Sequence, residues 1–147
     1  MERRRIGQSD VPRRTYSIPG RIEYVLGTAL DLDVDVLAMQ ETKLTDYQGS
    51  LVSRPTNLST AGWMVFFSPA KVVTNGNKSG GVAIAVRARW ADCIFNAVRG
   101  DKDTHHWYLH LDFHFGSRTV RFFSTDVPDK DSHDEPKVLA DRISKGL

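Results

Sequence analysis

The chain has 147 residues, of which 40% are hydrophobic and 26% charged, and its formal net charge is +2. This length and composition are typical of one globular domain with its own hydrophobic core. A single cysteine excludes an internal disulfide and cysteine-rich zinc motifs, and no apolar run approaches the ~20 residues of a membrane span. The N-terminus also lacks the apolar segment of a secretory signal. We therefore expect an intracellular protein, nuclear or cytoplasmic, with no membrane partner.

The positive charge is concentrated at the N-terminus. Residues 1–14 hold five arginines against two acidic residues, a surplus of +3, whereas the rest of the chain holds 15 basic and 16 acidic residues. The five are Arg3, Arg4, Arg5, Arg13 and Arg14. We expect a basic irregular arm over residues 1–16 and a folded domain over residues 17–147. The arm is either a solvated terminus or a nucleic-acid contact that binds phosphates.

The folded part is expected to begin with a helix and a strand. Apolar residues at positions 22, 25, 26, 29 and 30 follow the helical period. Pro19 suits the first turn of this helix and Ser17 is a suitable cap. The short apolar segment "VDVLAMQ" over residues 34–40 is typical of a buried strand.

Strands dominate the remainder of the chain. The polar residues 45–61 predict a loop, because they include Gly49 and Pro55. Strands are predicted over 62–70, 81–90 and 92–100, followed by a hairpin of 105–115 with 118–128. Asn75-Gly76 predicts a turn, and "SGG" at 79–81 predicts a bend where two backbone segments approach closely. A helix with Pro136 in its first turn is predicted near the C-terminus. The fold class is α+β, with a mostly antiparallel sheet.

The histidines of "HHWYLHLDFHF" (105–115) do not predict a metal site. His106, His110 and His114 share one face of the predicted strand, and positions four apart are roughly 13 Å apart. Zinc–nitrogen bonds of about 2.0–2.1 Å exclude a shared ion. A solvated polar face is expected instead. The sequence also lacks a phosphate-binding Walker loop and a GxSxG nucleophile motif.

Glu41 directly follows the predicted strand of residues 34–40. A carboxylate at the C-terminal end of such a strand either belongs to a turn or faces a ligand site at the rim of the sheet. Magnesium accepts one or two carboxylates together with the phosphates of a substrate. Glu41 is therefore the first candidate for a metal ligand.

Four segments together carry a family resemblance: "DVDVLAMQETKL", "GWMVFFSPA", "SGGVAIAVR" and a hairpin that ends in "STDVP". They resemble the N-terminal half of the endonuclease/exonuclease/phosphatase superfamily, in particular the apurinic-type endonuclease domains of non-LTR retroelements. The resemblance covers residues 18–140. It implies a partial four-layer α/β sandwich and magnesium-dependent phosphodiester hydrolysis, with Glu41 as the metal-binding glutamate. Asp126, at the end of the hairpin, is the second candidate: it is either a metal ligand, because it is a carboxylate, or a turn residue before Pro128.

The chain also departs from the family pattern. It lacks an early strand ending in a metal-site Asn, and Ser124 and Asp126 stand where the family has Asn and Tyr. The family's Gly-Asp-x-Asn and Ser-Asp-His motifs do not occur before Leu147. We therefore expect an incomplete or degenerate endonuclease-like domain, derived from a retroelement and inactive alone. The alternatives are a non-catalytic nucleic-acid-binding remnant and a module that associates through exposed sheet surface.

Overall fold

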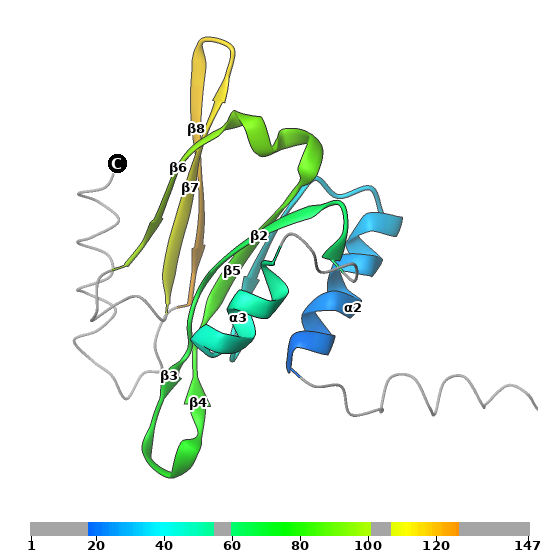
Figure 1. Cartoon of the computed structure of the whole chain (residues 1–147). Coiled ribbons are helices and arrows are strands. Elements are labelled where there is room, and N and C mark those ends of the chain that lie inside the picture. Colours follow the sequence, from blue (N-terminus) through cyan, green and yellow to red (C-terminus); the bar gives the residue numbers. More distant parts are fainter. Residues whose placement is uncertain (1–17, 55–59, 101–106, 127–147) are drawn as a thin grey trace, which may run out of the picture.

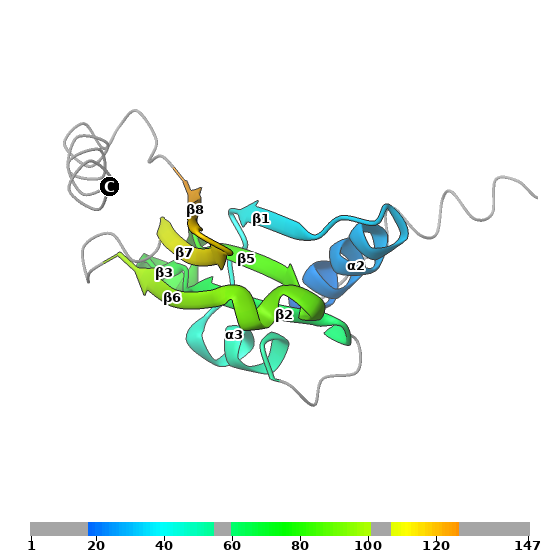
Figure 2. The ribbon, with the colours of Figure 1, turned by 90° about the horizontal axis from the view of Figure 1, so that it is seen from above.

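The computed structural model describes residues 18–54, 60–100 and 107–126. In this part of the chain two antiparallel three-stranded sheets lie face to face, and two helices cover the outer side of the first sheet (Figures 1 and 2). The predicted α+β class with mostly antiparallel strands is confirmed. The predicted basic arm and C-terminal helix lie outside the described residues.

The first sheet has the strand order β1-β5-β2 and the second has the order β6-β7-β8. The strands of the first sheet are β1 (Val36–Gln40), β2 (Trp63–Ser68) and β5 (Val82–Arg87), and those of the second are β6 (Ile94–Arg99), β7 (Tyr108–Phe115) and β8 (Arg118–Thr125). A small hairpin of β3 (Lys71–Val72) and β4 (Lys78–Ser79) projects from the first sheet (Figure 1). The predicted turn is confirmed at its tip, where Asn75 and Gly76 have φ angles of 70° and 76°.

Two apolar clusters hold these layers together. Between the helices and the first sheet, Ile22 and Leu26 pack with Val65 and Ala85. Between the two sheets, three residues of β5 pack against three of β7: Val82, Ile84, Val86, Leu109, Leu111 and Phe113. β5 is buried on both faces because it is the central strand between the two clusters. Its uninterrupted run of small and β-branched residues is suited to that position.

Helix α2 (Ile18–Asp31) confirms the predicted helix, with Pro19 in its first turn. Its buried face is narrower than expected. Ile22, Leu26 and Ala29 are buried, whereas Val25 and Leu30 are 40% and 42% exposed. The helix contacts the sheet along one narrow line, so only the i, i+4, i+7 positions reach the core.

The prediction of a loop over residues 45–61 is wrong at its start. Residues Asp46–Val52 form helix α3, which packs against β2. The hydroxyl of Thr45 accepts a hydrogen bond of 3.2 Å from the Gln48 amide, and the Gln48 side chain accepts one of 3.1 Å from the Thr45 amide. This reciprocal pair is a capping box, which stabilises a helix start even in a polar sequence.

Strand β1 corrects a second expectation. The apolar segment predicts a buried strand, but β1 lies at the edge of the first sheet and its residues are partly buried or exposed. Ala38 and Gln40 are exposed. The free edge of β1 brings its C-terminal end to the same side as the end of β8, which is in contact with it.

The outer face of the second sheet matches the solvated polar face that its histidines predict only at His114, which is exposed. His110 and Asp112 are only 4% and 3% exposed. Asp112 accepts hydrogen bonds of 2.6 and 3.0 Å from the Arg121 guanidinium and one of 3.0 Å from the Asn96 amide. The adjacent Arg121 guanidinium holds the pKa of Asp112 below its usual range. Burial lowers the pKa of His110, whose Nδ1 lies 2.5 Å from the Tyr108 hydroxyl. The face is an ion-paired network, so its charge does not have to be solvated.

None of the helices in the described ranges is long and apolar enough to cross a bilayer.

Candidate functional site

The C-terminal ends of β1 and β8 are tied together. The Ser124 hydroxyl donates a hydrogen bond of 2.9 Å to the Met39 carbonyl, and the Gln40 side-chain amide donates one to the Thr125 carbonyl. The next residue of each strand is acidic. Glu41 follows β1 and Asp126 follows β8, so these contacts bring the two carboxyl groups together.

A close approach of two backbone segments fixes the turn that carries Glu41. The amides of Thr42 and Lys43 donate hydrogen bonds of 3.0 Å each to the carbonyls of Gly81 and Gly80. Gly81 has a φ angle of +89°, and a Cβ atom there would lie 2.6 Å from the Thr42 hydroxyl. The prediction that the "SGG" segment lets two backbone segments approach is therefore confirmed. Glu41 itself has a left-handed φ angle of 51°.

The two carboxyl groups of the pair, Glu41 and Asp126, differ in their affinity for a proton. The Lys43 ammonium lies 3.0 Å from Glu41, whose side chain is 52% exposed. A hydrogen bond from protonated Asp126, together with Lys43, lowers the pKa of Glu41. Burial and the adjacent Glu41 raise the pKa of Asp126 to about 7. At neutral pH the pair therefore exists partly with one shared proton, because two carboxylates in contact do not ionise independently.

One atom of the pair lacks a partner. The Oδ2 atom of Asp126 is buried and accepts no hydrogen bond in the described part of the chain. Two ionised carboxylates offer only acceptors, so either a proton or a cation has to lie between them. Hard divalent cations such as magnesium prefer oxygen ligands of this kind and retain several waters of their own. The residues present therefore fit a weakly held magnesium ion, for which Glu41 and Asp126 would be the protein ligands.

The pair is not part of a larger cluster of metal ligands. Within residues 18–54, 60–100 and 107–126 no group of three His, Cys, Asp or Glu side chains is positioned to hold an ion. Lys43 was not among the predicted site residues, although it stands two positions after Glu41 in the "QETK" segment. The five predicted arginines of the arm, positions 3 to 14, lie outside the described residues.

No family model matches the sequence, and no curated protein matches it. Among solved structures, TDP2 from Caenorhabditis elegans is similar in fold, with a TM-score of 0.50 at 14% sequence identity. The fold of the chain is therefore similar to that of TDP2. The match covers 86% of this chain but only 37% of TDP2. At this identity the likeness to TDP2 is one of fold alone.

Proposed function

We propose that the chain is a magnesium-binding, endonuclease-like domain of the phosphodiesterase type, derived from a retroelement and degenerate in its catalytic machinery. The observation that carries the proposal is the contact between Glu41 and Asp126 at the adjoining ends of β1 and β8. The fold likeness to TDP2, a phosphodiesterase of the endonuclease/exonuclease/phosphatase fold, supports it.

The roles of the residues follow from their charges. Magnesium, when bound, would stabilise negative charge that develops on a phosphodiester. Glu41 is the more acidic partner and would hold the ion, whereas Asp126 would have to release its proton before it could do so. Lys43 places a positive charge beside the pair, which favours an anionic phosphate at this rim.

The residues around the Glu41–Asp126 pair argue against efficient hydrolysis. Within the described ranges no third acidic residue or histidine joins Glu41 and Asp126 to serve as a general base. Loss of a general base typically costs about 10²–10⁴ in rate, and loss of several members of one constellation removes most of the catalysis. We therefore propose metal and phosphate binding with no cleavage by this chain alone.

A nicking assay tests this proposal. The purified chain is incubated with supercoiled DNA and with DNA that contains an abasic site, with and without magnesium. We expect no magnesium-dependent nicking above buffer, together with weak magnesium binding that disappears in Glu41→Gln. Nicking that disappears in Glu41→Gln would show an active enzyme and overturn the degenerate assignment. Unchanged magnesium binding in the variant would overturn the site itself.

We also propose, as a second candidate, association through exposed sheet surface. The second sheet exposes several large apolar side chains: Phe95, Val98, Phe115, Val120 and Phe122, each between 36% and 50% exposed. Such a surface on a small domain favours association. Light scattering across a concentration series would show a rise in mass, and Phe122→Ser should reverse it. A constant monomer mass at all concentrations would rule this candidate out.

A further inference from the structure

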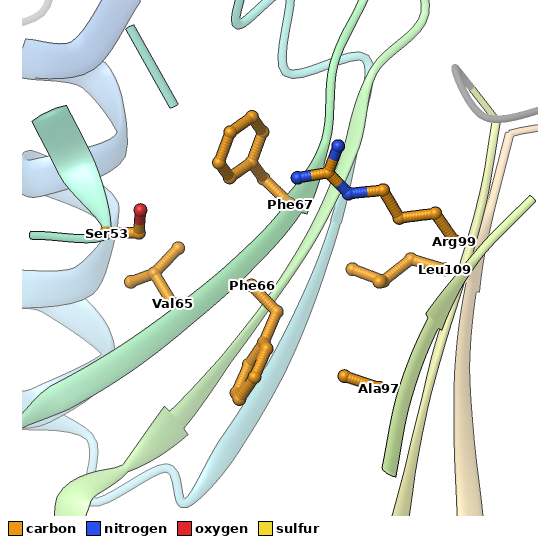
Figure 3. Close-up of a pocket in the computed structure, with 7 residues that line it drawn as sticks. All are labelled: Ser53, Val65, Phe66, Phe67, Ala97, Arg99 and Leu109. Carbon is orange, nitrogen blue, oxygen red and sulfur yellow. The ribbon is translucent and has the colours of Figure 1, made fainter. Parts of the chain in front are cut away.

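A cavity of about 300 Å³ opens at the outer edge of β2, beside β6 and the residue that follows α3 (Figure 3). It is lined by Ser53, Val65, Phe66, Phe67, Ala97, Arg99 and Leu109. β2 is the edge strand opposite to β1 in the first sheet, so this cavity is separate from the Glu41–Asp126 pair. The proposed function makes no use of it.

The lining of the cavity is apolar except at two positions. The Ser53 hydroxyl already donates a hydrogen bond of 2.8 Å to the Gly49 carbonyl. Arg99 remains, and its guanidinium lies 5.0 Å from the centre of the Phe67 ring (Figure 3). No acidic side chain of the described residues forms an ion pair with Arg99. Among the described residues, the cavity therefore combines a mostly apolar wall with one exposed cation that forms no ion pair.

We infer that this cavity binds a small aromatic anion, with its ring against Phe66 and Leu109 and its phosphate, phosphonate or carboxylate group on Arg99. Arg99 provides a planar set of donors that matches such oxyanions. Its position over Phe67 fixes the guanidinium at the mouth of the cavity, so little side-chain freedom is lost on binding.

Size limits the ligand to a single ring. The volume lies at the lower end of the range of about 300–1,000 Å³ for small-molecule sites, and an apolar cavity of roughly 150 Å³ already accommodates benzene. One charged contact and one partly buried ring give a dissociation constant of about 1 mM. Phenylphosphonate matches this description and cannot be hydrolysed as a phosphate ester, so it is the probe of choice.

The test is a titration of the full chain with phenylphosphonate, followed by amide chemical shifts in buffer that contains EDTA. We expect saturable shifts at Phe66, Phe67, Ala97 and Leu109. Benzyl alcohol lacks the charge and methylphosphonate lacks the ring, so each should bind at least about fivefold more weakly. Shifts that do not saturate, or that are centred on Lys43 and the β3–β4 hairpin, would overturn the assignment.

Two variants and a control complete the test. Arg99→Gln should weaken binding about tenfold, because a charge-assisted contact becomes neutral. Ala97→Phe should abolish binding by filling the cavity from its rim. The control is Arg89→Gln, since Arg89 is also an exposed arginine over an aromatic ring, at 5.8 Å from Trp90, and does not line the cavity. Equal affinity of the Arg99 and Arg89 variants would overturn the inference. Because EDTA removes divalent cations, this outcome is independent of the Glu41–Asp126 pair.

Discussion

The hydroxyl of Ser124 donates a hydrogen bond of 2.9 Å to the main-chain carbonyl of Met39, which joins the second sheet to the edge strand of the first. The acceptor is available because Met39 lies on β1, which is an edge strand of the first sheet. Two residues further along each strand stand Glu41 and Asp126. The acidic pair therefore depends on a contact between two sheets, and changes at Ser124 should affect it without removing either carboxyl group.

Magnesium affinity should depend on pH. Because the pKa of Asp126 is about 7, the pair has to lose a proton to bind the ion. The ionised fraction of Asp126 rises about tenfold between pH 6 and pH 8, so the dissociation constant should fall about tenfold across that range. Calorimetric titration measures it. Asp126→Asn should bind magnesium weakly at every pH, and an identical pH dependence in this variant would contradict the assignment of the titrating group.

Asp126 should also make stability depend on pH. Its folded-state pKa is raised from 3.8 to about 7, so the folded protein holds a proton that the unfolded chain releases. The stabilising contribution is present below about pH 4 and is lost as pH rises towards 7. Asp126→Asn resembles the protonated form. Its melting temperature should match that of the parent protein at pH 4 and exceed it by about 3 °C at pH 8, after allowance for solvent screening. Asp92→Asn, at an exposed position, should show no such divergence.

Two helical glycines should respond with opposite signs to alanine. A methyl group at Gly49 in α3 would overlap the Phe67 ring, whereas nothing lies within 4 Å of one at Gly27 in α2. Gly49→Ala should lower the free energy of unfolding by about 1–2 kcal/mol, because overpacking outweighs better helix propensity. Gly27→Ala should raise it by about 0.5–1 kcal/mol. Urea unfolding measures both, and stabilisation by both changes would mean that α3 does not pack on β2 as described.

The ion-paired network of the second sheet should contribute strongly to stability. Asp112→Asn keeps the side-chain size but removes the charge that Arg121 and Asn96 contact. The cost should be about 2–3 kcal/mol at pH 7, less than for a fully buried pair because the Arg121 side chain is 25% exposed. The pKa of Asp112 is lowered, so this advantage is present above about pH 4 and is lost as pH falls through the folded-state pKa. Asp35→Asn, which removes the exposed partner of Arg89, should shift the urea midpoint far less.

The arginines of residues 1–14 provide a test of nucleic-acid binding. If they contact phosphates, the logarithm of the binding constant should fall with the logarithm of salt concentration, by about 0.9 per phosphate on duplex DNA. Replacing all five arginines with glutamine should flatten this slope, whereas replacement with lysine should preserve it. Fluorescence anisotropy at several salt concentrations measures the effect. An unchanged slope in the glutamine variant would show that the arm makes no phosphate contacts.

The strands could be predicted from the sequence because the alternation of apolar and polar residues indicates which face of a strand is buried. The alternation around Leu109, Leu111 and Phe113 correctly predicted the face of β7 that enters the core. Helix α3 was missed because its signal is the capping pair of Thr45 and Gln48, which a reading of apolar periodicity does not detect. Local patterns also do not show what covers a face, so the burial of the ion-paired network on the second sheet was not predicted.

In the candidate site, too, some features could be predicted from local sequence and others depend on the tertiary structure. The position of Glu41 directly after a predicted strand makes it a candidate metal ligand, whereas Asp126 is a candidate only by comparison with the family pattern. Their contact depends on the pairing of distant segments, and so does the perturbed pKa of Asp126. The cavity beside Arg99 combines residues of α3's C-terminal end, β2, β6 and β7, and no short segment of sequence contains its signature.

The contacts between β1 and β8 have a consequence for folding. β7 and β8 are adjacent along the chain and pair through the turn at Gly116, whereas Gln40 and Thr125 are 85 residues apart. Contacts between residues so far apart in the sequence have a larger entropic cost of loop closure, so they form late in folding. We expect the Glu41–Asp126 pair to assemble in the last step of folding and to separate first during partial opening. A brief local opening would then return Asp126 to its ordinary acidity while both apolar clusters remain intact.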